Sequence, residues 1–173
     1  PNGNPYAVCG IATDITERSR AEKAFVRANR SLRVLTESSQ AYARCSSEDE
    51  YLTKVCQTIV QSGGYRLAWI GYAEDNEQQQ VSVKAQFGYD DGYLDTLDIT
   101  WKDTPRGRGP TGSAIRLRKP QIAQNILQDP NFTPWRRDAL HRGYASSIAI
   151  PLISNGEILG ALNIYAPEPD AFD

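Results

Sequence analysis

Three glycines, Gly107, Gly109 and Gly112, have the spacing of a phosphate-binding loop, but their surroundings argue against that use. A dinucleotide-binding loop follows a strongly apolar strand and opens the helix of a βαβ unit, and neither pattern surrounds these glycines. Pro110 interrupts the turn, and no Lys follows Gly112 as a Walker loop requires. A helix beginning near Thr111 remains, where free N–H groups could hold an anion or Thr111 could simply cap the helix. We expect this loop to form one wall of a pocket.

Side chains that commonly catalyse reactions or bind metals are sparse. His141 is the single histidine, and it lies in a basic segment near an expected helix end, where a solvated cationic cap is its simplest role. The cysteines Cys9, Cys45 and Cys56 are far apart and odd in number, a poor basis for disulfides. No serine lies in an elbow motif. We therefore predict a cytoplasmic protein in a reducing compartment, with no metal site and no enzymatic activity.

The aromatic residues and the loops point instead to a binding pocket. Trp69 lies in the middle of an apolar strand and is expected in the core, whereas Trp135 lies in an irregular segment and could stack on a planar ligand. Irregular segments that cover a sheet leave a concave space suited to a small molecule. The residues that we expect at this pocket are Phe87, Trp101, Thr111, Gly112, Ile122, Trp135 and Ala149.

Composition limits the classes of partner. The chain has 173 residues, 19 basic and 21 acidic, with a formal net charge of −2, so no basic excess attracts nucleic acid or an anionic membrane. No apolar run reaches the roughly 18–20 residues needed to span a bilayer. The length predicts one domain with a short extension. The chain lacks Met and begins with Pro1 in turn chemistry, so we expect a piece of a longer protein.

The first 44 residues predict a strand followed by a long helix. Residues 1–13 contain a turn and a short apolar strand, and residues 14–44 contain no Pro or Gly. Apolar residues repeat in this helix at heptad spacing, which is typical of a seam that faces a partner helix. The helix could instead pack on its own domain, but we favour a parallel homodimer. The seam comprises Ala21, Phe25, Ala28, Leu32 and Leu35, continued by Ser39 and Tyr42.

The rest of the chain predicts an α+β domain. Ser47 and Glu50 form a capping box at the start of a helix over residues 47–62. Apolar runs then predict strands at residues 66–72, 81–87, 98–101, 121–124, 146–153 and 158–165. Asn155-Gly156 joins the last two as a hairpin. The order predicts a central antiparallel sheet of about six strands, with the terminal helices on one face and pocket-forming loops and short helices on the other.

Two stretches resemble known families. The first resembles the end of a PAS domain, where the last strand runs into a signalling helix: Gly10-Ile11-Ala12-Thr13-Asp14-Ile15-Thr16-Glu17-Arg18. The second, from about residue 35 onward, resembles a GAF domain and includes Gly109-Pro110-Thr111-Gly112-Ser113-Ala114-Ile115, Asp129-Pro130-Asn131-Phe132, Ser146-Ser147-Ile148-Ala149-Ile150-Pro151-Leu152 and Gly160-Ala161-Leu162-Asn163-Ile164-Tyr165-Ala166. The resemblance implies that the chain has three parts: the end of a PAS domain at residues 1–13, a coiled-coil linker helix at 14–44 and a GAF domain at 45–173.

Membership of that family would imply a regulatory sensor that binds a small molecule, although its identity stays open. The pocket segments have no Cys to attach a bilin, the cyclic-nucleotide signature is missing, and a single histidine makes haem a poor fit. A PAS end followed by a GAF domain resembles bacterial signalling proteins. We therefore expect a sensor histidine kinase, or alternatively a diguanylate cyclase or phosphodiesterase.

Two other functions fit parts of the sequence. The domain could be a purely structural dimerisation module with a filled core. It could also be an enzyme, since a relative of this fold reduces methionine sulfoxide with cysteines. Cys45 and Cys56 fall in expected helices, however, and residues 81–166 contain no cysteine, so we set this function aside.

Overall fold

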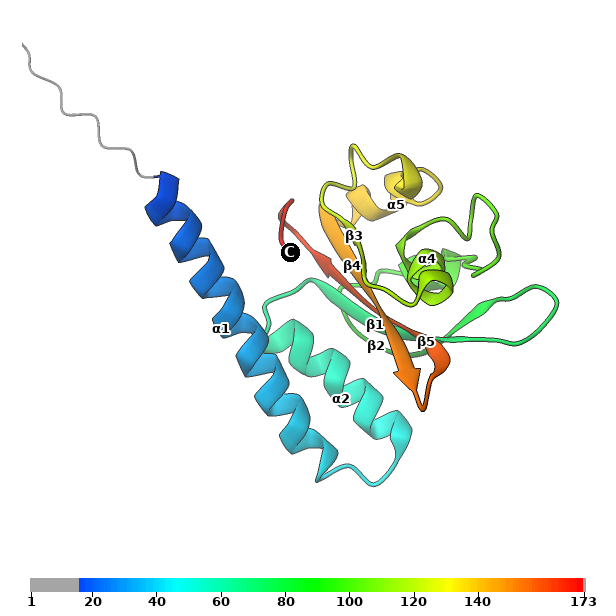
Figure 1. Ribbon diagram of the computed structural model, residues 1–173, viewed down its shortest axis with the longest axis horizontal. Helices are drawn as coiled ribbons and strands as arrows, with labels where there is room; N and C mark the ends of the chain where they lie inside the picture. Colours follow the sequence, from blue (N-terminus) through cyan, green and yellow to red (C-terminus); the bar gives the residue numbers. More distant parts are fainter. Residues whose placement is uncertain (1–15, 173) are drawn as a thin grey trace, which may run out of the picture.

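The computed structural model describes residues 16–172, which form a five-stranded antiparallel sheet with helices on both faces (Figure 1). The strand order is β2-β1-β5-β4-β3, so the last hairpin lies at the centre of the sheet. The expected α+β fold is confirmed. The strands are β1 (Leu67–Ala73), β2 (Val81–Gly88), β3 (Gln121–Ala123), β4 (Ser146–Ser154) and β5 (Glu157–Ala166).

Two helices, α1 (Thr16–Tyr42) and α2 (Glu48–Gln61), lie on one side of the sheet, with α2 against the strands and α1 outside it (Figure 1). The predicted N-cap at Ser47 forms, and Glu50 reaches back to the residue before it rather than to Ser47 itself. The Ser47 hydroxyl accepts a hydrogen bond from the Glu50 N–H at 3.2 Å, and the Glu50 carboxylate accepts one from the Ser46 N–H at 2.9 Å. The strand expected within residues 1–13 lies outside the described residues.

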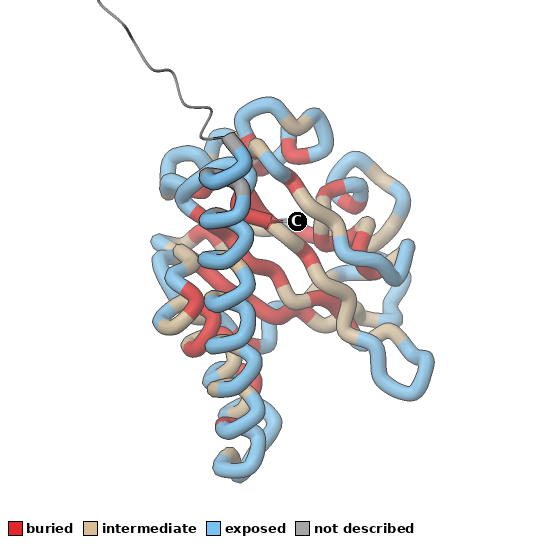
Figure 2. Tube along the Cα trace, turned by 60° about the vertical axis from the view of Figure 1, so that its left-hand side comes forward, coloured by how far each residue is buried: buried red, intermediate tan, exposed pale blue. Residues whose placement is uncertain are grey.

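The long helix α1 has two distinct faces. Its inner face packs on the domain through Val34 and Ala41 and through Arg30, whose guanidinium lies 4.6 Å from the Tyr65 ring centroid. Its outer face is exposed along the described helix (Figure 2). That outer face carries the predicted seam, in which Phe25, Leu32 and Leu35 are 60–70 % exposed and Ala21 and Ala28 are also exposed. Phe25 and Leu32 therefore remain exposed, whereas Leu35 also borders the groove between α1 and the strands and the Tyr42 ring packs against Tyr51 of α2.

Alternating side chains divide the core into one layer on each face of the sheet. In β1, Leu67 and Trp69 point to one face, whereas Ala68 and Ile70 point to the other, because successive strand residues face opposite sides. The helix face packs aliphatic residues against α2. The other face packs an aromatic cluster, and Trp69 lies there fully buried, as predicted.

Short segments cover this second face: α3 (Tyr93–Thr96), α4 (Pro110–Leu117), the 3₁₀ turn η1 (Pro130–Phe132) and α5 (Arg136–His141). Among the described residues, the strand expected at 98–101 is reduced to one isolated bridge between Thr100 and Gln80. The Thr100 hydroxyl accepts the Lys102 N–H at 3.1 Å, which turns the backbone away from further pairing. The sheet thus has five strands where about six were expected.

The closing hairpin has the predicted turn. Asn155 and Gly156 both have positive φ, 51° and 84°, as a two-residue hairpin turn of this kind requires. Within residues 16–172, no helix combines the length and the hydrophobicity needed to cross a membrane.

Candidate functional site

A small cavity lies between the aromatic face of the sheet and the N-terminal end of α4. It is small, with about 10 Å³ open to the centre of a water molecule, which is about the room for a single water. The lining residues come from six separate segments: Tyr93, Leu97, Ile99, Arg106, Gly109, Pro110, Thr111, Gly112, Phe132, Trp135, Ser147, Ile148, Asn163 and Tyr165.

Three of these residues have buried polar atoms without a hydrogen-bond partner. They are the Tyr93 hydroxyl, the Trp135 indole N–H and the Ser147 hydroxyl, on side chains that are at most 7 % exposed. Trp69 Nε1 in the same core and Ser38 Oγ near α2 are also unpartnered. Burying such a group without a partner costs about 1–3 kcal/mol. The cavity therefore concentrates unused hydrogen-bonding capacity in one place.

The N-terminal end of α4 is attached to the central strand β5. The Thr111 hydroxyl donates to Asn163 Oδ1 at 2.7 Å, and both residues are buried. The expectation that Thr111 caps the helix is wrong, because Gly109 is the N-cap and Pro110 takes the first helical position. Proline suits this position, since its fixed φ is helical and its missing N–H would have been unpaired. The Thr111 side chain is thus available to join α4 to β5.

The glycine motif is explained by close packing. A Cβ on Gly109 would lie 2.3 Å from the Trp135 ring, and one on Gly112 would lie 2.3 Å from the Gly107 carbonyl oxygen. Only glycine allows these approaches. The loop does line the cavity, as expected, and its glycines bring the Trp135 indole against the start of α4.

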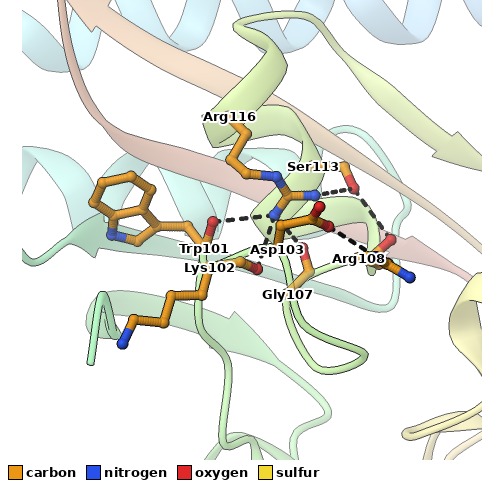
Figure 3. Close-up of polar contacts among 7 residues, drawn as sticks. All are labelled: Trp101, Lys102, Asp103, Gly107, Arg108, Ser113 and Arg116. Carbon is orange, nitrogen blue, oxygen red and sulfur yellow. Dashed lines mark hydrogen bonds and ion pairs between the residues drawn. The ribbon is translucent and has the colours of Figure 1, made fainter. Parts of the chain in front are cut away.

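Arg116 holds the loop that leads into α4 (Figure 3). Its Nη1 donates to the backbone carbonyls of Trp101 at 3.0 Å, Lys102 at 3.2 Å and Gly107 at 2.5 Å. Its Nη2 also lies 3.3 Å from the Ser113 hydroxyl. One guanidinium thus satisfies three carbonyls of a segment that has no ladder of its own. This arrangement positions the cavity wall.

The aromatic cluster keeps its phenols neutral. The Tyr93 ring makes edge contacts with the rings of Tyr144 and Tyr165, with centroids 5.3 Å and 5.8 Å apart. Burial raises the pKa of Tyr93, Tyr144 and Tyr165 above the ordinary value of 10.0. At neutral pH the Tyr93 hydroxyl is therefore protonated and able to donate a hydrogen bond.

Some of the predicted pocket residues line the cavity, and others lie elsewhere in the structure. Thr111, Gly112 and Trp135 line the cavity, and the fully buried Ala149 shares its strand face with Ser147.

Phe87 and Ile122 were placed wrongly, because they pack against the aliphatic core on the helix face. The parity of their strands puts them there. Trp101 also lies outside the cavity lining. It is half-buried, and its Nε1 donates to the Glu74 carbonyl at 3.2 Å.

Sequence reasoning missed most of the polar lining. Tyr93, Ser147, Asn163 and Tyr165 were not predicted, and neither was Arg106 at the mouth. One signal was available in β5, where Asn163 interrupts an apolar strand and shares its face with Tyr165. An isolated amide in a central strand indicates a buried polar contact.

Neither described cysteine lies at the cavity. Cys56 is fully buried in α2 on the helix face, and burial raises its pKa to about 12, so its thiol stays protonated. Cys45 lies between α1 and α2. His141 is exposed at the end of α5. Among the described residues, no group of His, Cys, Asp and Glu could hold a metal ion.

Comparisons with a family model and with solved structures agree on the fold. The family model of the GAF domain matches residues 45–173. No curated protein sequence matches significantly.

Solved structures include the GAF domain of a phosphoenolpyruvate-protein phosphotransferase from Coxiella burnetii, with 19 % identity, a TM-score of 0.67 and coverage of 82 % of this chain and 80 % of that one. Free methionine-R-sulfoxide reductase from Neisseria meningitidis, solved with its substrate, has 18 % identity, a TM-score of 0.62 and coverage of 96 % and 84 %. A domain of a two-component sensor histidine kinase protein from Sinorhizobium meliloti has 16 % identity, a TM-score of 0.52 and coverage of 75 % and 79 %.

Proposed function

The chain belongs to the GAF domain family, and from that membership and the geometry of its cavity we propose that it is a regulatory sensor for a small molecule. The observation that carries the proposal is the set of three partnerless polar atoms around one cavity. A ligand that satisfied them would recover hydrogen-bonding free energy that the empty protein forgoes. The described cysteines lie away from the cavity, which argues against a reductase that uses cysteines at this site.

Strand β5 offers a physical connection from the cavity to α1. Asn163 and Tyr165 line the cavity, whereas Leu162 and Ile164 face the helix side and line an apolar groove with Val34 and Leu35 of α1. A ligand that shifts β5 therefore also changes the surface on which α1 rests. We propose that α1 has two positions and that the ligand favours one of them.

The second part of the proposal is a parallel homodimer through α1. Its seam repeats at heptad spacing, with Phe25 and Leu32 on the outer face and Leu35 at the edge, where it also lines the groove. Two copies joined along this seam would turn a shift of α1 into a change of helix crossing. Such a change could reach an output domain, for which we propose a bacterial sensor histidine kinase; a diguanylate cyclase or phosphodiesterase is the alternative. The PAS end within residues 1–13 and the cytoplasmic location belong to the same proposal.

The sensor proposal is tested by screening chemically diverse metabolites for a rise in melting temperature, with native mass spectrometry to detect bound mass. We expect at least one compound to stabilise the protein. Replacing Gly109 with Val would push a side chain into the Trp135 ring and abolish that rise. If no compound shifts the melting temperature of the folded chain, the sensor proposal fails.

The dimer is tested with a charge in the seam. Leu32→Lys should convert a dimer to a monomer in native mass spectrometry, because a buried unpaired charge opposes association. Leu127→Lys is the matched control, since Leu127 is 59 % exposed outside α1. If the wild-type chain is monomeric at high concentration, or both variants dissociate equally, the seam is not the interface.

One observation favours a second candidate function, a purely structural dimerisation module. The cavity has room for about one water molecule, so the core is nearly filled. On this hypothesis the chain would form the same dimer, and no small molecule would change its melting temperature. The two experiments together separate the two functions.

A further inference from the structure

The chemistry of the cavity lining indicates what kind of molecule it would bind. Resting on the sensor function proposed above, we propose that the cavity binds the carboxylate group of a short-chain carboxylic acid. The argument depends on the balance of donors and acceptors and on the charge at the mouth. Because the cavity has room for about one water molecule, a carboxylate enters only if the segments that cover this face move outward.

The partnerless groups are mainly donors. The Trp135 indole N–H can only donate, and the hydroxyls of Tyr93 and Ser147 can each donate one hydrogen bond. At the start of α4, the N–H groups of Thr111 and Gly112 precede the first intrahelical bond, which the Ser113 N–H makes to Gly109 at 3.0 Å. The residues that carry these groups line one cavity and come from four segments of the chain.

The acceptors near the cavity are already in use. Asn163 Oδ1 accepts from Thr111 at 2.7 Å, and the Asn163 amide nitrogen lies 3.3 Å from the Ala161 carbonyl. Among the described residues that line the cavity, none is Asp or Glu. The Tyr93 and Ser147 hydroxyls can accept as well as donate, but the Trp135 N–H can only donate. A ligand that pairs with all three groups therefore needs at least one acceptor, and a carboxylate supplies two oxygens that can accept from all of them.

The charge favours a monoanion over a phosphate dianion. Arg106 is the one basic residue among the described lining residues, and its guanidinium lies 3.8 Å from the Asp98 carboxylate. Both side chains are more than half exposed, so solvent screens them. The ion pair thus leaves little net charge at the mouth, and the remaining donors are neutral, so nothing in the lining offsets the second charge of a phosphate dianion. Leu97, Ile99 and Phe132 add apolar walls that suit a short alkyl body.

The test is a titration of the ¹⁵N-tryptophan-labelled chain with acetate, followed by NMR through the indole N–H signal of Trp135. That signal is assigned by its loss in Trp135→Phe. We expect a saturable downfield shift, because a proton donated to a carboxylate is deshielded. Acetamide, which has the same shape without the charge, and inorganic phosphate are titrated in parallel and should bind at least tenfold more weakly.

Paired variants identify the donors. Tyr93→Phe and Ser147→Ala should each weaken acetate binding about ten- to a hundredfold, the range for a hydrogen bond to a charged group. Tyr72→Phe is the control for the first, since the Tyr72 hydroxyl donates to Glu48 on the helix face. Ser82→Ala is the control for the second, since Ser82 donates to Glu74 at the sheet edge.

The outcomes separate this inference from the function on which it rests. If acetamide or phosphate binds as tightly as acetate, or the cavity variants behave like their controls, the carboxylate assignment is overturned. If a neutral metabolite from the screen moves the Trp135 signal and acetate does not, the sensor function stands and only the ligand class is wrong. If nothing moves the signal or the melting temperature, both proposals fail.

Discussion

The two faces of the sheet differ in what covers them and in how tightly. The cavity face is covered by rings and short helices that leave room for about one water molecule. The helix face is covered by aliphatic side chains, and between α1 and the strands it leaves an open apolar groove with about 360 Å³ of room for water-sized molecules. Ile148, Ile150, Leu162 and Ile164 line that groove.

This difference indicates a division of tasks. Close-packed aromatic rings with partnerless polar atoms specify one shape and one chemistry, because each misplaced atom loses contacts or hydrogen bonds. A loosely covered aliphatic surface has no directional requirement, so α1 can change position on it at low cost. We infer that the cavity face provides specificity and the helix face permits movement.

The largest expected difference is between two Phe→Ala replacements, one in the aromatic core of the cavity face and one on the exposed surface of α1. Phe132→Ala removes a ring that is 2 % exposed and packs against Trp135 and Tyr165, so the free energy of unfolding should fall by about 3–5 kcal/mol. Phe25→Ala, at a residue of α1 that is 70 % exposed, should change it by less than about 0.5 kcal/mol in the monomer. Urea unfolding measures both. Equal effects would contradict the exposed position of Phe25 on α1.

Arg116 tests whether the cavity wall depends on one guanidinium. Arg116→Met keeps much of the side-chain bulk but leaves the Trp101 and Gly107 carbonyls without their donor, whereas the Lys102 carbonyl still accepts from the Thr104 N–H. The free energy of unfolding should fall by about 1–3 kcal/mol. Hydrogen exchange should rise in residues 101–109 and stay unchanged in α2. Arg118→Met is the control, since Arg118 donates to Gly156 in the exposed hairpin turn. A wild-type exchange pattern in Arg116→Met would contradict this role.

Removing the hydroxyls of two adjacent serines in β4 should change the free energy of unfolding in different directions. Ser146 Oγ donates to the Glu168 carbonyl at 2.7 Å, so Ser146→Ala should cost about 1 kcal/mol. Ser147 Oγ on the cavity face is partnerless, so Ser147→Ala should be neutral or stabilising in the absence of ligand. Thermal unfolding of the two variants measures the difference. Destabilisation by Ser147→Ala equal to that by Ser146→Ala would mean that the Ser147 hydroxyl has a partner in solution.

The smallest expected difference between the two faces is in how stability depends on alkaline pH. A phenol whose pKa is raised by folding contributes stability that is complete below the unfolded pKa of 10.0 and is lost as the pH rises through the folded value. The free energy of unfolding should therefore fall above about pH 10. Tyr93→Phe should flatten this fall more than Tyr72→Phe, because Tyr93 is 1 % exposed. For Tyr72, burial and then the bond to Glu48 raise the pKa to about 12.

Equal slopes for the two variants, measured by urea unfolding between pH 8 and pH 11, would show that alkaline sensitivity is shared by both faces. The pH dependence of stability would then not distinguish the buried phenol of Tyr93 from the partly exposed phenol of Tyr72.

Much of the fold could be predicted from local patterns. The N-cap at Ser47, the turn at Asn155-Gly156 and the strands that flank it were all correct. These features depend on hydrogen bonds and backbone angles within a few residues. The expected strand at residues 98–101 failed because side-chain bonds of Thr100 compete with strand pairing.

The site was harder to predict, for a geometric reason. Trp135, Thr111 and Gly112 were identified because they stand in unusual loops, whereas Phe87 and Ile122 were assigned to the wrong face. A one-residue change in strand parity moves a side chain to the opposite side of the sheet. The pattern of apolar residues alone does not say which side holds the cavity.

The sequence by itself determined the class of the domain, its helices and hairpins, and the heptad stripe on α1, because periodicity and caps are local properties of the chain. The tertiary structure decided which polar atoms meet. Tyr93, Trp135 and Ser147 come from three distant segments, and only the sheet topology and the packing of Gly109 against Trp135 bring them around one cavity. A hydrogen bond requires atoms within about 3 Å of each other, and separation along the chain does not determine that distance.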